Sequence, residues 1–142
     1  MPSENSLQRF LDAQQASYPT ALAEINSGRK RTHWMWYIFP QIQGLGLSET
    51  ARFYALRDRA EAAAFLQHPV LGARLLEISQ ALLDLPSNDP YRILGSPDDM
   101  KLKSSMTLFA NLQAHPVFQR VLDKFYAGAS DDKTLQILAK QQ

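Results

Sequence analysis

Apolar residues recur at every third or fourth position along most of the chain. In the clearest stripe, successive apolar positions are four, three, four and three residues apart: Leu71, Leu75, Ile78, Leu82 and Leu85. This spacing places all of these side chains on one face of an α-helix. His68-Pro69 precedes the stripe and Pro86 follows it. Because proline suits the first helical position and stops a helix elsewhere, we expect the longest helix of the chain here.

The same periodicity predicts further helices. Leu7 to Gln14 form a first short helix, and Pro19 opens a second that Gly28 ends. The others begin at a capping residue or a proline: after Ser48 (burying Phe53, Tyr54 and Leu56), at Asp58, between Asp89 and Gly95, at Ser96-Pro97-Asp98-Asp99, from His115-Pro116 to Gly128, and after Ser130 or Asp131. No Asn-Gly or Asp-Gly separates alternating apolar runs, so no β-hairpin is predicted.

These elements predict an all-α fold, a compact single-domain bundle of about seven to nine short-to-medium helices. The chain has 142 residues, of which 45% are hydrophobic, and this suits one domain with a single core. We expect that domain to span residues 1–142, with 1–5 as a flexible tail and 6–140 as the helical part.

Residues 29–41 break the helical pattern with a dense run of cations and aromatic rings, RKRTHWMWYIFPQ. Thr32 is suited to cap a helix here, and Pro40 disfavours helical backbone at Phe39. A buried helix of about two turns is favoured, with a buried strand as the alternative. Met35, Tyr37, Ile38 and Phe39 are expected in the core.

Charge and composition exclude several classes of function. The net charge is only +1 and both signs are interspersed, so nothing indicates a nucleic-acid or membrane partner. The absence of cysteine excludes disulfides and thiol nucleophiles. No leader-like stretch opens the chain, and no apolar run approaches the ~20 residues of a membrane span. A cytoplasmic protein is therefore expected.

The first candidate site lies at the start of the aromatic run. Arg29 and Arg31 are suited to binding phosphate or carboxylate bidentately, and His33 to moving a proton. The rings of Trp34 and Trp36 are suited to stacking on a base or sugar, and Gln41 to recognising hydroxyl or amide groups. The alternative is that the aromatic rings belong to the core and the cations to a solvated loop.

A second candidate site lies on the helix at 101–109. Lys101, Ser104 and Ser105 share one side of that helix by the three-and-four rule, so the hydroxyls and the lysine could hold a phosphate together. With His33, the two serines are the candidate catalytic residues. No Gly-x-Ser-x-Gly turn frames either serine, which disfavours nucleophilic catalysis. The alternative is that the serines bond back to the helix and Lys103 pairs with Asp99.

Metal and cofactor signals are missing from the sequence. The three histidines, His33, His68 and His115, have no four-residue spacing, and the last two precede prolines at helix starts, where capping explains them. The glycines of the loop at 43–47 form neither a P-loop nor a dinucleotide fingerprint. We therefore expect no metal and no cofactor.

Four segments together resemble a known family: GRKRTHWMWYIFPQ at 28–41, GLGLS at 44–48, HPVLGARL at 68–75 and KLKSSMTLF at 101–109. They are similar to domain-of-unknown-function family 1810, some of whose members are labelled calpastatin-like. The resemblance runs from about Leu7 to Leu138, with Thr32 where serine is usual. It implies a compact, mainly helical single domain and no established activity. An unstructured protease inhibitor would lack these apolar helices.

Two functions fit these observations. In the first, a basic and aromatic pocket binds a small anionic metabolite such as a nucleotide or sugar phosphate. The chain could bind this ligand alone or also process it. Because both candidate sites belong to the motifs of the resembled family, we expect them to share that pocket. In the second, the exposed edge of Arg29 to Trp36 docks a protein partner without chemistry.

Overall fold

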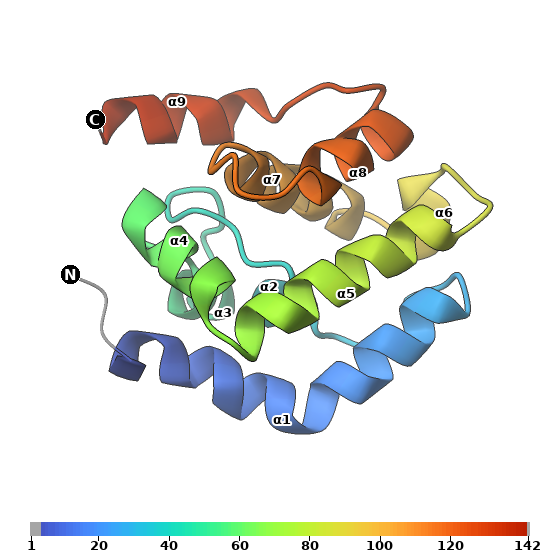
Figure 1. Ribbon diagram of the computed structural model, residues 1–142, viewed down its shortest axis with the longest axis horizontal. Helices are drawn as coiled ribbons and strands as arrows, with labels where there is room; N and C mark the ends of the chain where they lie inside the picture. Colours follow the sequence, from blue (N-terminus) through green and yellow to red (C-terminus); the bar gives the residue numbers. More distant parts are fainter. Residues whose placement is uncertain (1–3, 142) are drawn as a thin grey trace.

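The structure of the chain, a computed structural model, describes the backbone of residues 4–141 and the side chains of residues 7–141. Within these residues the fold consists of nine α-helices and no strand, and one isolated β-bridge pairs Ile42 with Leu56 between helices. The predicted all-α class is therefore confirmed (Figure 1). The helices are α1 (Glu4–Asn26), α2 (Met35–Ile38), α3 (Glu49–Tyr54), α4 (Arg59–Gln67), α5 (Leu71–Asp84), α6 (Pro90–Leu94), α7 (Asp98–Ala110), α8 (Val117–Tyr126) and α9 (Asp132–Lys140).

The first two predicted helices are one helix. Proline at position 19 lies inside α1 and does not begin a new element, so the predicted break was wrong. An internal proline removes one hydrogen bond and bends a helix without necessarily ending it. The ribbon of α1 bends along its length in Figure 1. Of the predicted tail, residues 1–3 lie outside the described residues, and residues 4 and 5 belong to α1.

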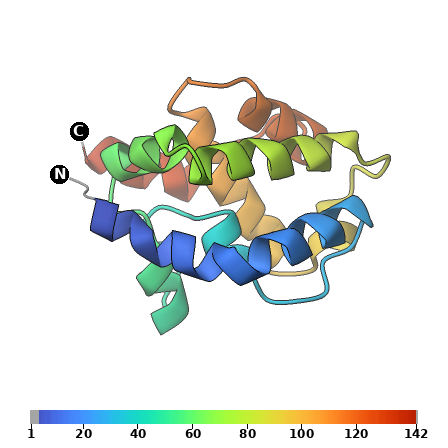
Figure 2. The ribbon, with the colours of Figure 1, turned by 60° about the horizontal axis from the view of Figure 1, so that its bottom comes forward.

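The helix α5 carries the predicted apolar stripe through the centre of the bundle. It lies between α1 and α8 and contacts both of them as well as α4 (Figures 1 and 2). Leu71, Leu75, Ile78 and Leu82 are at most 1% exposed. The prediction that this is the longest helix was wrong, because α5 has 14 residues and α1 has 23.

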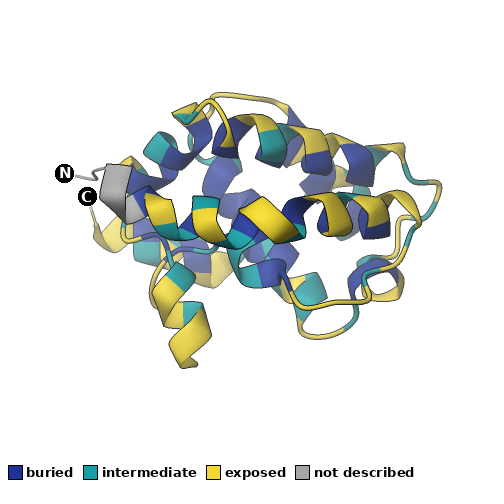
Figure 3. Ribbon diagram, turned by 90° about the horizontal axis from the view of Figure 1, so that it is seen from below, coloured by how far each residue is buried: buried dark blue, intermediate teal, exposed yellow. Residues whose placement is uncertain are grey.

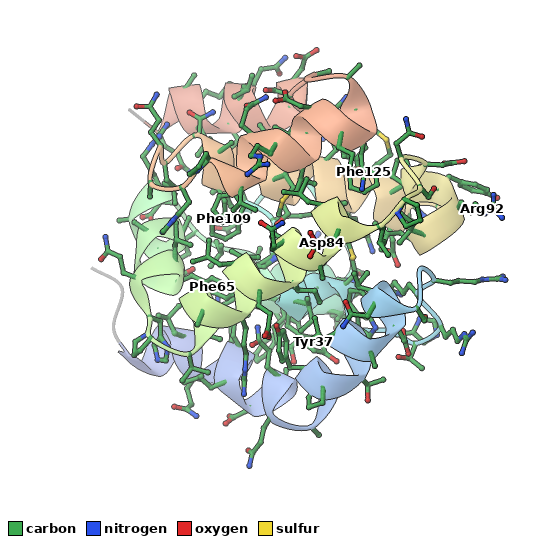
Figure 4. All side chains as sticks on the ribbon, turned by 45° about the vertical axis from the view of Figure 1, so that its right-hand side comes forward. Tyr37, Phe65, Asp84, Arg92, Phe109 and Phe125 are labelled. Carbon is green, nitrogen blue, oxygen red and sulfur yellow. The ribbon has the colours of Figure 1, made fainter. Side chains whose placement is uncertain are left out.

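A chain of phenylalanine rings links four helices through the core. Phe10 of α1 lies 5.0 Å from Phe65 of α4, centroid to centroid. Phe65 lies 5.8 Å from Phe109 of α7, and Phe109 lies 5.5 Å from Phe118 of α8. All four are fully buried, and Figure 4 shows Phe65 and Phe109 inside the bundle. Such ring contacts add stabilisation beyond the burial of apolar area.

Several helix starts follow the sequence signals. Ser48 and Asp131 accept hydrogen bonds from the backbone N–H groups of Ala51 and Thr134, as their capping roles require. Asp58 and Asp89 also cap their helices as predicted. The imidazole Nδ1 of His68 accepts from the N–H groups of Val70 and Leu71, which explains this histidine by capping.

Two other helices begin where predicted but lack the expected caps, and one predicted burial was wrong. Neither α7 nor α8 has a side-chain cap, so Ser96 and His115 do not play that role. Phe53 was expected in the core, but it is 59% exposed. It lies on α3, which projects from the bundle and buries no residue (Figures 2 and 3). A helix of 6 residues has too little length to bury a full face.

Candidate functional site

A buried carboxylate shapes the loop that carries the predicted cations. Glu24, near the end of α1, is 9% exposed and accepts hydrogen bonds from the backbone N–H groups of Arg31 and Thr32, at 2.8 and 3.1 Å. It also accepts from the Thr32 hydroxyl at 2.8 Å and from the Trp34 indole Nε1 at 2.9 Å. These four bonds fix the backbone between α1 and α2.

These bonds also set the charge of Glu24. Burial alone would raise the pKa of this carboxyl, but the N–H of Arg31, the indole of Trp34 and the groups of Thr32 together lower it to about 2. The side chain is therefore ionised at neutral pH. It places one negative charge directly beneath a loop that carries three consecutive cations.

The aromatic segment is a single helical turn. Thr32 was expected to cap it, but its hydroxyl is bonded to Glu24, and α2 begins at Met35 without a side-chain cap. The helix has 4 residues, about one turn where two were predicted. Met35, Ile38 and Phe39 are buried as predicted. Tyr37, labelled in Figure 4, is only half-buried, and its hydroxyl donates to that of Ser17 at 3.0 Å.

The two predicted sites meet at Asp98, in the first turn of α7. Its carboxylate lies 2.9 Å from the Lys30 ammonium and 3.5 Å from the Lys101 ammonium. Lys101 also lies over the ring of Trp36, with 5.0 Å from Nζ to the centroid, and Lys30 lies over Trp34 at 5.2 Å. The contact between the stretches is thus an ion-paired cluster in which the two lysines share one carboxylate.

The serines of α7 face the interior. The Ser104 side chain is 6% exposed and its hydroxyl donates to the Met100 carbonyl at 3.2 Å, which is the predicted bond back to the helix. Ser105 is fully buried, and its hydroxyl has no partner among the described residues. Lys103 lies over the Tyr126 ring and does not form the predicted pair with Asp99.

The other predicted site residues range from fully exposed to fully buried. Arg29, Arg31 and His33 are exposed, Gln41 and Trp36 are half-buried, and Trp34 is only 1% exposed. The Trp34 ring therefore has no free face for a ligand. Arg31 borders a groove of about 360 Å³ on α1, away from Lys101.

A cleft of about 630 Å³ lies where the loop after α1 meets α6. We call it the Arg29–Arg92 cleft; its walls are residues 27–30 and 91–95. The N–H of Lys30 donates to the Ile93 carbonyl at 2.7 Å and ties the two walls together. In Figure 4, Arg92 extends from α6 away from the body of the bundle.

Glycines leave this cleft open to a close approach. Gly28 and Gly95 have φ angles of +87° and +77°, and a Cβ at either position would meet no atom within 4 Å. A left-handed backbone of this kind favours glycine. Each glycine is close in sequence to a side chain that could contact a ligand. Arg29 follows Gly28, and Tyr91, which is 63% exposed, lies in α6, the helix that ends at Gly95.

Two arginines make the cleft positive. In the part of the chain that the structure describes, neither Arg29 nor Arg92 has a carboxylate within 4.0 Å, whereas Lys30 forms an ion pair with Asp98. Sequence reasoning included Arg29 but missed Tyr91 and Arg92, because it interpreted residues 89–95 only as a helical turn. The available signal was a pair of glycines, each close to an arginine in sequence.

Residues 7–141 contain no group of three or more His, Asp or Glu side chains placed to hold a metal ion. None of the helices described is long and apolar enough to cross a membrane.

Comparison with known proteins places this all-α chain in a family. Residues 4–138 match the family described as "Protein of unknown function (DUF1810)", which is nearly the whole chain. The chain belongs to this family, and the resemblance of its four segments is thereby confirmed.

A solved structure has the same fold. The crystal structure of the conserved hypothetical protein Rv1873 from Mycobacterium tuberculosis is 43% identical in sequence, with a TM-score of 0.94. The match covers 96% of this chain and 99% of that one. A search of curated proteins gave no significant match. The family description carries no activity, so function has to be argued from the site.

Proposed function

We propose that the Arg29–Arg92 cleft binds a small anionic metabolite, a nucleotide or a sugar phosphate. The observation that carries this proposal is the pair of arginines, Arg29 and Arg92, on opposite walls of one cleft without a carboxylate partner among the described residues. Guanidinium groups bind phosphate oxygens through two parallel hydrogen bonds, and two such groups suit one phosphate or a diphosphate.

The rest of the cleft supports a ligand with a ring. Tyr91 presents an exposed aromatic face on which a base or sugar can stack. The open backbone at Gly28 and Gly95 lets the ligand lie against the main chain. The volume of about 630 Å³ falls in the usual range of about 300–1,000 Å³ for small-molecule sites.

The lining supports binding without chemistry. Its residues, 27–30 and 91–95, include no histidine, aspartate or glutamate, the side chains that most often act as general acids or bases. The candidate catalytic residues lie elsewhere: His33 does not line the cleft, and Ser104 and Ser105 are buried in α7.

Docking of a protein through the edge of Arg29 to Trp36 has less support. Interfaces are centred on large apolar or aromatic side chains. The exposed part of this edge is polar, consisting of Arg29, Arg31, Thr32 and His33, and none of the exposed large apolar side chains of the described residues belongs to it.

Titration calorimetry with AMP, ADP and ribose 5-phosphate tests the proposal, with adenosine as the uncharged comparison. We expect the phosphates to bind and adenosine to bind at least tenfold more weakly. Arg29→Ala and Arg92→Ala should each weaken phosphate binding by about tenfold or more, which is about 1.4 kcal/mol. Arg52→Ala is the matched control, because Arg52 is an exposed arginine on the projecting α3. Equal affinity in all three variants would contradict the proposal.

A further inference from the structure

We propose that a second site, which is mainly apolar, binds a small amphipathic carboxylate. Such a ligand has an apolar body and one carboxylate group. The site is the groove between α4 and the segment that joins α7 to α8, which we call the α4 groove. Its apolar walls are Ala60, Ala63, Leu66, Leu112 and Ala114. Arg59 and His115 border it, and its volume is about 630 Å³.

The groove follows the length of α4. Positions 59, 60, 63, 66 and 67 of its lining lie on one face of a helix of 9 residues. At 1.5 Å per residue, that face is about 13 Å long. Small side chains at Ala60 and Ala63 leave the face hollow, and Leu112 and Ala114 form the facing wall. The groove therefore suits a narrow, extended apolar body.

One cation is held in place at this apolar surface. The Arg59 guanidinium donates to the Asn111 backbone carbonyl at 3.0 Å and to its side-chain oxygen at 3.4 Å. Guanidinium has five N–H donors, so several remain for a ligand after these two bonds. No acidic residue lines the groove, and Arg59 has no carboxylate within 4.0 Å in the described part of the chain.

This charge arrangement selects a monovalent acid. A fixed cation beside apolar walls lacks a counter-charge, and a carboxylate supplies one with the bidentate geometry that guanidinium prefers. The apolar walls stabilise the body of the same molecule by removing it from water. The α4 groove and the Arg29–Arg92 cleft share no lining residue, so this proposal is independent of the first.

Sodium octanoate, with 1-octanol and acetate as comparisons, tests the proposal on the whole chain. Carbon-13 methyl spectra report on the alanine and leucine methyl groups that line the groove. We expect saturable shifts confined to Ala60, Ala63, Leu66, Leu112 and Ala114 with octanoate. Affinity for octanol should be about tenfold lower, and acetate should cause no shift. Shifts centred elsewhere, or equal affinity for octanol and octanoate, would overturn the proposal.

Variants separate the two parts of the site. Ala63→Phe fills the groove and should abolish octanoate binding. Arg59→Gln should reduce affinity for octanoate to that for octanol, while Arg59→Lys, which keeps the charge, should retain part of the preference. Arg52→Ala, on the projecting α3 and in neither site, should leave octanoate binding unchanged. Unchanged binding in Ala63→Phe overturns the proposal. Concentration-dependent self-association that Ala63→Phe removes also overturns it, because the groove would then be an interface between copies.

Discussion

The indole of Trp34 donates a hydrogen bond to the carboxylate of Glu24, with 2.9 Å between Nε1 and Oε1. This bond ties the aromatic segment to α1 across the cation loop. The tryptophan is 1% exposed and the carboxylate 9%, so both partners are removed from water. A buried carboxylate with four donors is costly to leave unpaired and stabilising when paired.

The free energy of unfolding should change with pH as the Glu24 carboxylate is protonated. The pKa of Glu24 in the folded chain is lowered from the ordinary 4.5 to about 2, so its stabilisation is complete above pH 4.5 and is lost as the pH falls towards 2. At neutral pH it is on the order of 3 kcal/mol. Urea denaturation should therefore show Glu24→Gln less stable at pH 7, with the difference shrinking between pH 4.5 and 2.

Glu49→Gln is the control for this measurement, since Glu49 is exposed in the first turn of α3 and accepts no hydrogen bond from a described residue. Its effect should stay below about 1 kcal/mol. A Glu24→Gln difference that does not change with pH would show that the carboxylate contributes by its shape and not by its charge.

Gly72 should resist replacement by alanine. A Cβ at this position would lie 1.9 Å from the carbonyl oxygen of Leu66, where α4 and α5 approach each other. In an ordinary helix, Gly→Ala stabilises by up to about 1 kcal/mol. Here the sign should reverse, with the free energy of unfolding falling by about 3 kcal/mol or more because backbone must move.

The comparison is with Ala73→Gly at the next, exposed position of α5, which should cost about 1 kcal/mol by helix propensity alone. Urea denaturation of both variants gives the two values. A Gly72→Ala protein as stable as the parent chain would mean that the α4–α5 approach is looser than the structure shows.

The ammonium of Lys124 should contribute to the free energy of unfolding through the backbone carbonyls that it binds. It donates to the carbonyls of Leu82 and Leu83 at 3.1 and 2.9 Å, and to that of Leu85, at the end of α5. The Leu82 carbonyl also accepts from the N–H of Leu85, so the ammonium matters most for the other two. Burial lowers the pKa of this group. Lys124→Met keeps the apolar stem but removes the donor from the Leu83 and Leu85 carbonyls, and should lower stability by about 2 kcal/mol. Lys133→Met, on the exposed side of α9, should change it by less than about 0.5 kcal/mol in the same thermal or urea measurement.

The sequence predicted the elements that depend on local chemistry. The spacing of Leu71, Leu75 and Ile78, and the caps at Ser48 and Asp58, involve residues close together in the chain. Pro19 was misinterpreted because a proline that opens a helix and one that bends a helix look alike locally. Whether Phe53 is buried depends on where α3 lies, which no local pattern records.

The site was harder to predict for the same reason. The aromatic run stood out in the sequence as unusual. The sequence could not show that Glu24, ten residues before Trp34, accepts hydrogen bonds from the Trp34 indole and the Thr32 hydroxyl. Nor could it show that Arg92 lies across a cleft from Arg29, because only the fold brings these segments together. From the sequence, the two stretches were expected to share a ligand pocket; the contact that the structure shows between them is an ion pair at Asp98, which the sequence analysis did not single out.

Asp98 should restrain anion binding in the Arg29–Arg92 cleft. Its carboxylate lies 2.9 Å from the Lys30 ammonium, and Lys30 lines the cleft. Asp98→Asn removes this counter-charge and leaves the lysine free to attract phosphate. We expect affinity for ADP to rise severalfold, and the free energy of unfolding to fall by about 1 kcal/mol as the two partly buried ion pairs are lost.

Asp99→Asn is the matched control for that variant. It removes the same charge one residue further along α7, but Asp99 forms no ion pair with either lysine in the described part of the chain. Calorimetry with ADP should show a clear increase for Asp98→Asn and little change for Asp99→Asn. An equal increase for both would show that only the net charge of the surface matters. A decrease for Asp98→Asn would mean that the carboxylate holds Lys30 in the geometry that binding needs.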